Sequence, residues 1–299
     1  MPADAQTVCR LFLYNDCMQK KRISISDISE LKKSFAGQGL NTVCQSAKCP
    51  NIGECFKHNT ATFLIMGKHC SRNCSFCAVE KQKPQALDPS EPSKIAKAVQ
   101  DLGLSYAVIT SVTRDDLPDG GANHFAKTIS EIKRLLPDIK VEVLTPDFFG
   151  RTELIDIVLR AKPDVFSHNI EMVPSLYPKI RNMADYNRSL SVLKYISSIS
   201  LSTFHFSPLV KTGIMVGLGE TFDEIKQTIR DIKNAGADIL TIGQYLAPTK
   251  RHWPVAKEYS EEEFKELEMF AKSAGIKNIV SGRYVRSSYM AGKYFQNSK

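Results

Sequence analysis

The fold of this chain is constrained most strongly by a regular alternation of short apolar segments with longer amphipathic ones. The apolar segments have the length and the β-branched, aromatic character of buried strands: 62–66, 106–110, 140–144, 165–170, 212–216 and 239–242. The segments between and after them have the spacing of helices: 91–102, 123–136, 152–161, 187–198, 221–235 and 261–274. Such alternation predicts parallel βαβ units, which right-handed crossovers arrange into an open sheet or a barrel. Periodicity alone does not choose between these two α/β architectures.

Polar or glycine-rich residues follow several of the predicted strands. Gly120 and Gly121 come after the second strand, Asn169 and Glu171 end the fourth, and Gly217 ends the fifth. Glycine lets the backbone approach a ligand closely, and an acidic residue at a strand end often faces a ribose. These residues therefore predict a ligand site at the carboxyl ends of the strands, with ordinary turns and a solvated edge as the alternative. His168, inside the fourth strand, is expected to be a core or edge histidine with satisfied hydrogen bonds rather than a ligand.

Six of the eight cysteines fall into two triplets with different spacing. The first has the pattern C-x4-C-x5-C, and the second, C-x3-C-x2-C, directly follows the first predicted strand. The triplets are Cys44, Cys49 and Cys55, and then Cys70, Cys74 and Cys77. Three thiolates on so tight a loop can hold three corners of a cubic [4Fe–4S] cluster and leave the fourth iron without a protein ligand. An open iron is a place where a small molecule can coordinate.

Two other uses of cysteine compete with an iron–sulfur cluster. A disulfide framework suits short secreted chains that lack a core, whereas this chain has 299 residues, 42% of them hydrophobic. Structural zinc takes four ligands, and neither triplet supplies four, although His58 and His69 are near enough in sequence to keep zinc conceivable. Cys9 and Cys17 lie outside both triplets and are expected to be free thiols.

Composition narrows the location and the partners of the chain. Free and cluster-binding cysteines favour a reducing compartment, and the absence of an 18-residue apolar run and of a signal peptide predicts a cytoplasmic protein without a membrane segment. The formal charge of +8 comes largely from scattered lysines. A dense basic run with interleaved aromatics is missing, so nucleic acid is not expected as a partner. A basic surface can instead steer an acidic protein.

The second triplet, with Phe76 directly before its last cysteine, resembles the signature loop of the radical S-adenosylmethionine (SAM) superfamily. The first triplet, within the segment Val43–Cys55, is similar to the auxiliary-cluster motif of the lipoyl synthase family. The tail Val285-Arg286-Ser287-Ser288-Tyr289 resembles the R-S-S-Y tail of that family. The resemblance covers roughly residues 35 to 295. It implies a partial (β/α)6 TIM-like barrel with N-terminal and C-terminal extensions that carry an auxiliary iron–sulfur cluster.

The resemblance also implies roles for individual residues. The second triplet would hold the [4Fe–4S] cluster that cleaves SAM, with the glycine pair near the amino group of SAM. Asn169 and Glu171 would contact its ribose, and the segment 213–220, which includes Gly217, its adenine. Ser288 would be the fourth ligand of the auxiliary [4Fe–4S] cluster, with Ser287 as the less favoured choice. A hydroxyl is a weak ligand for iron beside thiolates, which suits a cluster that comes apart.

The activity implied by the resemblance is insertion of two sulfur atoms at C6 and C8 of an octanoyl chain. That chain is linked to a lysine of a carrier domain, in the E2 subunits of 2-oxoacid dehydrogenases or the glycine cleavage H protein. Two SAM molecules would be used, the auxiliary cluster would supply the sulfur, and ferredoxin or flavodoxin would supply electrons. Carrier domains are commonly acidic, which agrees with the basic surface of this chain.

The same resemblance divides the chain into four parts: an arm (1–40), an auxiliary-cluster loop (41–61), the barrel (62–280) and a closing tail (281–299). Two other functions remain open on the sequence. One is another two-cluster radical SAM enzyme, such as a biotin synthase-like sulfur inserter or a methylthiotransferase. The other is a non-enzymatic metal-binding module, which would need neither a SAM pocket nor a six-strand barrel.

Overall fold

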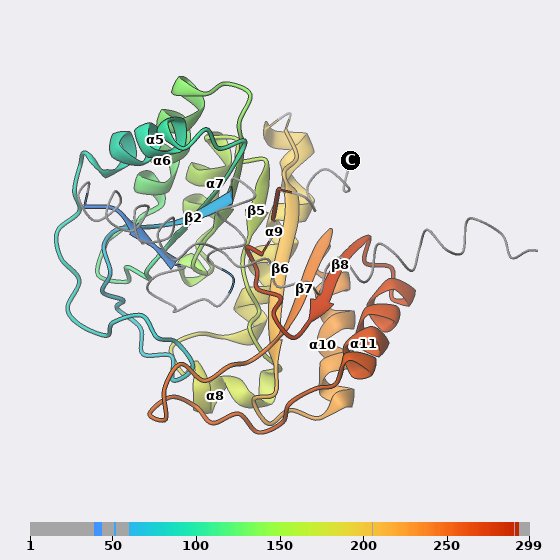
Figure 1. The fold of residues 1–299 in the computed structure, drawn as a ribbon. Helices are drawn as coiled ribbons and strands as arrows, with labels where there is room; N and C mark the ends of the chain where they lie inside the picture. The colour runs from blue at the N-terminus through green and yellow to red at the C-terminus, as the bar shows by residue number, and fades with distance from the viewer. Residues whose placement is uncertain (1–38, 44–50, 52–59, 205, 290, 293–299) are drawn as a thin grey trace, which may run out of the picture.

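A computed structural model of the chain describes residues 39–43, 51, 60–204, 206–289 and 291–292. Its strands form one sheet in which spatial order follows chain order from β1 to β8 (Figure 1). The strands are β1 (Asn41–Thr42), β2 (Thr60–Ile65), β3 (Tyr106–Ser111), β4 (Lys140–Leu144), β5 (Val165–Ser167), β6 (Leu209–Val216), β7 (Ile239–Gln244) and β8 (Asn278–Gly282). β1 is antiparallel to β2, and all later neighbours are parallel. Within the described part of the chain β8 has no pairing with β1 or β2, so the barrel is incomplete.

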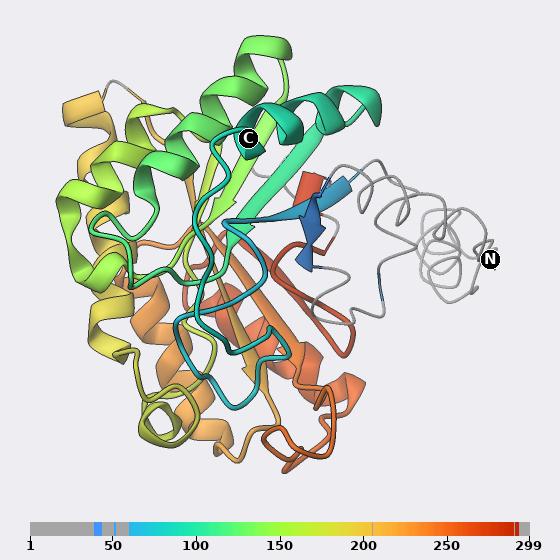
Figure 2. The same ribbon diagram turned by 90° about the vertical axis from the view of Figure 1, so that its left-hand side faces the viewer.

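Helices follow the parallel strands and cover the outer face of the sheet (Figures 1 and 2). They are α5 (Glu91–Asp101), α6 (Ala122–Leu135), α7 (Thr152–Arg160), α8 (Tyr177–Ile180), α9 (Tyr186–Phe204), α10 (Phe222–Asn234) and α11 (Glu261–Ser273), with short 3-10 turns at Phe148–Gly150 and Pro174–Leu176. Six strand–helix units run from β2 to α11. The prediction of a partial (β/α)6 barrel is therefore confirmed. None of the described helices has the length and apolar character needed to cross a bilayer.

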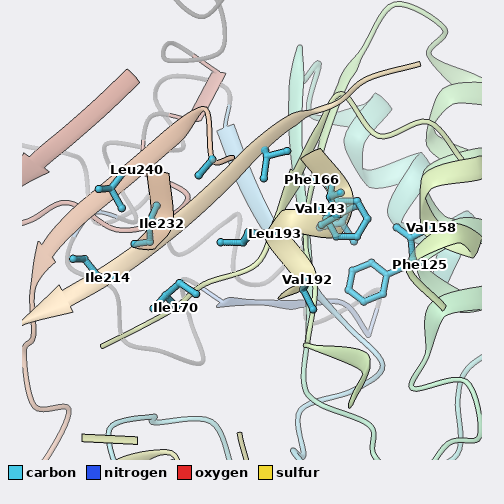
Figure 3. Packing of buried hydrophobic residues seen from close by; sticks show 14 of the residues in the cluster. Phe125, Val143, Val158, Phe166, Ile170, Val192, Leu193, Ile214, Ile232 and Leu240 are labelled. Atoms are coloured by element: carbon cyan, nitrogen blue, oxygen red, sulfur yellow. The ribbon is translucent and has the colours of Figure 1, made fainter. Parts of the chain in front are cut away.

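The core between sheet and helices is built from the outward side chains of the strands. Figure 3 shows Val143 of β4 and Phe166 of β5 close to Phe125 of α6 and Val158 of α7. All four side chains are fully buried. This apolar layer fixes the strands, and so it fixes the loops at their carboxyl ends, which are called the rim below.

The inner face of the barrel differs because it contains a charged network. Lys211 donates to both carboxylate oxygens of Glu142, at 2.8 and 3.0 Å, and the Tyr106 hydroxyl donates to Glu142 at 2.7 Å. All three side chains are buried, and burial raises the pKa of Tyr106 well above its ordinary value, with the Glu142 charge adding to the effect. Ala291 packs on Tyr106 in the same inner cluster. The part of the C-terminal tail at residues 291–292 therefore lies inside the barrel.

Several element boundaries differ from those the sequence predicts. β6 begins at Leu209 rather than residue 212 because the polar Lys211 is buried as the partner of Glu142. β5 ends at Ser167, not at residue 170, because the chain leaves the ladder before Glu171, which has a φ of 68°. The sequence did not predict β1, β8 or α8. Every residue of the short strand β8 is partly buried, so its sequence lacks a clear alternation of apolar and polar residues. The capping residues and acids of Ser26-Asp27-Ile28-Ser29-Glu30 also favour a short helix near residues 26–35, which lies outside the described residues.

Candidate functional site

The second cysteine triplet lies in the loop between β2 and α5, at the rim. Cys70, Cys74 and Cys77 are free thiols and are partly buried. Short-range backbone bonds shape the loop: Cys77 N donates to Cys74 O at 3.2 Å, and Cys70 N donates to Glu80 O at 3.0 Å. The three thiols therefore share one compact turn, as the spacing predicts.

The surroundings of the second triplet raise the pKa values of two of its thiols. Burial raises the pKa of Cys74, against the opposing charge of Arg181, and raises the pKa of Cys77 to about 12. Neighbouring thiols raise both further. A buried thiol with a raised pKa ionises only when a bound metal replaces its proton. No three His, Cys, Asp or Glu side chains in the described part of the chain converge on one ion.

Arg72 attaches the cysteine loop to the ends of two strands. Its guanidinium makes paired hydrogen bonds to Asp115, at 2.7 and 3.1 Å, and to Asp147, at 2.6 and 3.0 Å. Arg188 of α9 also donates to Asp147, at 2.9 Å, and both guanidinium groups lie over the Phe149 ring. Burial opposes ionisation of Asp147, but the hydrogen bond and charge of Arg72 outweigh it and hold the pKa of Asp147 well below its usual range. The loop is thus fixed by a buried ion-pair network.

Ser75, between the second and third cysteines, joins two further loops of the rim. Its N–H donates to the Ile180 carbonyl at 2.9 Å, and its carbonyl accepts from Trp253 N at 3.0 Å. Ile180 ends α8, which follows β5, and Trp253 lies in the loop after β7. The Trp253 indole donates to Leu218 O at 2.8 Å. The loops after β2, β5, β6 and β7 are therefore held together at one end of the barrel (Figures 1 and 2).

The residues predicted to contact the ribose lie together where β5 ends. Asn169 Nδ2 donates to Glu171 Oε1 at 3.1 Å, and Asn169 Oδ1 is buried and has no partner among the described residues. Glu171 bonds to β6 through its backbone, donating to Gly213 O and accepting from Met215 N. Burial raises the pKa of Glu171, while the Arg181 charge opposes that rise. A buried, unpartnered amide oxygen beside a partly buried carboxylate fits a ligand that brings hydrogen-bond donors, as ribose hydroxyls do.

His168 is satisfied at only one of its nitrogens. Nδ1 lies 2.9 Å from the Thr145 carbonyl and must donate to it, while Nε2 is buried without a partner among the described residues. Burial, with the nearby Arg181 charge, lowers the pKa of His168 to about 4. The expectation of a fully satisfied histidine is therefore wrong for Nε2, which is a bare acceptor in the neutral ring.

The predicted glycines have local structural reasons to be glycine. Gly121 has a φ of 87° at the start of α6, and a Cβ there would lie 2.2 Å from Met66 Sδ, directly before the cysteine loop. Gly217 has a φ of 98°, and a Cβ would lie 2.2 Å from Gln244 Nε2. Glu220 accepts from the backbone of Gly217 and Leu218, so that carboxylate is occupied within its own loop. Gly120 lines a small rim cavity of about 240 Å³ with Asp115 and Phe148.

The C-terminal tail crosses the inner face of the barrel close to these residues. A Cβ at Gly213 would lie 3.2 Å from Asn169 Oδ1 and 3.5 Å from Ser287 Cβ. Ser288 is partly buried in the same turn. Cys44, Cys49 and Cys55 lie outside the described residues. Asn51, which falls between the last two of them in sequence, is described, and its side chain donates to Tyr284 O of the tail at 2.6 Å.

Sequence reasoning missed the residues that position the site. Arg72 and Arg181 carry no motif of their own. The carboxylates that Arg72 meets lie in the loops after β3 and β4, and Arg181 acts through the positive charge that it places near Cys74 and Glu171. A weak signal existed for Arg72, because an arginine inside a cluster loop next to cysteines must find buried carboxylates. Ser75 bonds to both neighbouring loops through its backbone, which no side-chain pattern reveals, and its hydroxyl adds a 3.3 Å bond to the Ile180 carbonyl.

Comparison with known proteins gives a family for this arrangement. Residues 64–232 match the model described as the Radical SAM superfamily. A lipoyl synthase from Caldanaerobacter subterraneus subsp. tengcongensis is 52% identical over 274 residues, covering 91% of this chain and 94% of that protein. One from Caldicellulosiruptor bescii is 53% identical over 267 residues, covering 89% of each chain. Among solved structures, methylornithine synthase superposes with a TM-score of 0.53 at 14% identity, covering 73% of this chain and 70% of that one, which shows the fold alone.

Proposed function

The chain belongs to the lipoyl synthase family of the radical SAM superfamily, and from this membership we propose which of its residues perform the reaction. It is a radical SAM enzyme that inserts sulfur, and its family implies a [4Fe–4S] cluster and SAM as cofactors. Relatives about half identical over about nine-tenths of the chain leave no reason to prefer a biotin synthase-like enzyme, a methylthiotransferase or a non-enzymatic module.

Cys70, Cys74 and Cys77 hold the first cluster. When bound, that cluster supplies the electron that converts SAM into methionine and a 5′-deoxyadenosyl radical, which abstracts hydrogen from an unactivated carbon. The residues of the chain hold and orient SAM. Asn169 and Glu171 bind its ribose, the glycines at 120 and 121 leave room for its amino end, and the turn at Gly217 lies beside its adenine. Arg72 keeps the three thiols in place by anchoring their loop to β3 and β4.

The sulfur comes from a second [4Fe–4S] cluster, held by Cys44, Cys49, Cys55 and Ser288 and consumed as a substrate. Two contacts support this assignment. Asn51, within the first triplet's segment, bonds to the tail at Tyr284, and a Cβ at Gly213 would lie 3.5 Å from Ser287 Cβ and 3.2 Å from Asn169 Oδ1. These contacts support a sulfur donor that faces the same barrel interior as the predicted SAM site. This proximity is the observation that carries the proposal.

The substrate is an octanoyl chain on a lysine of a carrier domain, in the E2 subunits of 2-oxoacid dehydrogenases or the glycine cleavage H protein. Sulfur enters at C6 and C8, each step uses one SAM, and ferredoxin or flavodoxin supplies electrons in the cytoplasm. In this scheme residues 1–40 form an arm, 41–61 and 281–299 enclose the auxiliary cluster, and 62–280 form the catalytic barrel.

The test separates the two clusters by mutation. Anaerobically reconstituted wild type should contain about eight irons per chain, as two cubanes require. Cys74→Ala should lose reductive SAM cleavage and keep about four irons. Cys49→Ala should also keep about four irons and still form 5′-deoxyadenosine, but an octanoyl-lysine peptide should gain no sulfur by mass analysis. Lipoyl product from Cys49→Ala would remove the auxiliary cluster as the sulfur donor.

A further inference from the structure

The exposed large hydrophobic side chains of this protein are concentrated at the rim. The described residues of this kind, with their exposed fractions, are Phe149 (51%), Met183 (45%), Val255 (36%), Met269 (63%) and Tyr284 (56%). All except Met269, which is on α11, lie in segments that follow the carboxyl ends of strands. Single exposed apolar residues are common, but their gathering at one end of a barrel indicates a contact surface.

Two of these residues lie on loops that are joined through the cysteine loop. The Ser75 backbone bonds to Ile180 on one side and to Trp253 on the other, at 2.9 and 3.0 Å. Met183 follows Ile180 by three residues, and Val255 follows Trp253 by two. These two exposed side chains therefore flank the loop that carries Cys74 and Cys77.

The same two loops carry positive charge that no described residue neutralises. Lys179, Lys250 and Arg251 are exposed, and no ion pair joins any of them to another described residue. Nearby charges behave differently, since Lys257 pairs with Glu263 at 2.6 Å and Glu258 pairs with Arg283 at 2.8 Å. Uncompensated cations beside apolar side chains suit a partner whose face is acidic and partly apolar.

We propose that Lys179, Met183, Lys250, Arg251 and Val255 form the surface on which the octanoylated carrier domain docks through an acidic face. This inference rests on the proposed function. A substrate fixed to a protein cannot reach the barrel interior unless that protein meets the rim. The three cations would accelerate and orient the encounter, and the two apolar side chains would slow dissociation.

The test uses the reconstituted holoenzyme with two substrates, an octanoylated carrier domain and a short octanoyl-lysine peptide. The double variant Lys250→Glu with Arg251→Glu should raise both the KM and the Kd for the carrier domain about tenfold at low salt. The Kd is read independently from the anisotropy of a fluorescently labelled carrier domain. The KM for the peptide and the formation of 5′-deoxyadenosine should stay unchanged. Added salt should weaken carrier binding by the wild type and have little effect on the variant.

A matched control places the same change of charge at the opposite end of the barrel. Arg160 ends α7 and Lys162 follows it; both are exposed, and no ion pair joins either to another described residue, so Arg160→Glu with Lys162→Glu should leave the carrier KM and Kd as in the wild type. Met183→Ser with Val255→Ser should raise the carrier Kd several-fold while keeping its salt dependence. Unchanged carrier binding by the charge-reversed variant, or an equal rise in its peptide KM, would overturn the docking surface. Failure of the wild type to thiolate the peptide would instead overturn the proposed function.

Discussion

Replacing Arg72 with methionine tests whether the cysteine loop is held by its ion pairs. The Arg72 side chain is 3% exposed and makes four hydrogen bonds to two carboxylates. Asp147 is fully buried and, among the described residues, would keep hydrogen bonds from Arg188 and from the Phe149 N–H. Asp115, whose side chain is 15% exposed, would gain contact with water. Removing one partner of a buried pair costs about 3–5 kcal/mol, mostly because it leaves the other charge without compensation.

For a chain of 299 residues, a loss of about 3–4 kcal/mol corresponds to a fall in Tm of about 5 °C. The assay is thermal unfolding of the metal-free protein, followed by anaerobic reconstitution and measurement of iron content. Arg72→Met should unfold at the lower temperature and incorporate fewer irons. Arg72→Lys keeps the charge but cannot make paired hydrogen bonds to both carboxylates, so its Tm should lie between those of the wild type and Arg72→Met.

The control is Arg134→Met on α6, which breaks a solvent-exposed pair with Glu131 and should cost less than about 1 kcal/mol. An Arg72→Met protein with wild-type Tm and iron content would refute the reasoning. It would show that the loop is positioned by its backbone bonds alone.

Three further outcomes are expected. Ser288→Cys should bind the auxiliary cluster at least as stably as the wild type, because thiolate suits iron better than a hydroxyl does. The same variant should donate sulfur more slowly. If only Ser287→Cys changes the spectrum of that cluster, Ser287 is the ligand. The pKa of His168 is about 4 in the folded protein and 6.5 in the unfolded chain, so between these pH values the unfolded chain binds one more proton. The free energy of unfolding therefore falls as pH falls from about 6.5 to 4, by up to about 3 kcal/mol. When unfolding is measured across pH 4 to 7, His168→Asn should lack this pH-dependent decrease. Gly217→Ala should lower the free energy of unfolding by about 2–4 kcal/mol in chemical denaturation, because the added Cβ would overlap Gln244. Gly219→Ala is the control: its Cβ would lie 3.8 Å from the nearest neighbour, so it should show only the smaller cost of a positive φ.

The sequence by itself determined the class of fold, and it predicted the chemistry of the first cluster site. Strand and helix periods are local properties, so the alternation from residue 62 to 274 predicted the β/α units in the order observed. Cysteine spacing is also local, and C-x3-C-x2-C placed Cys70, Cys74 and Cys77 on one loop at a strand's carboxyl end. The resemblance of the motifs identified the family that the comparisons confirm. The assignment of Cys44, Cys49, Cys55 and Ser288 to a second cluster stays a prediction.

Only the tertiary structure decided which distant residues support the site. From the sequence alone, Lys211 interrupts an apolar strand pattern. The structure shows that it is buried because Glu142, which also accepts from Tyr106, lies beside it on another strand. The pairing of Arg72 with Asp115 and Asp147 depends on the order of β2, β3 and β4 in space. The contact between Ser287 and the Gly213 position joins segments more than 70 residues apart in sequence, and the bond from Asn51 to Tyr284 spans 233 residues. Contacts of this kind depend on how distant segments pack together. They leave no periodic pattern in the sequence, because the residues next to each partner in the chain do not determine which distant residue that partner contacts.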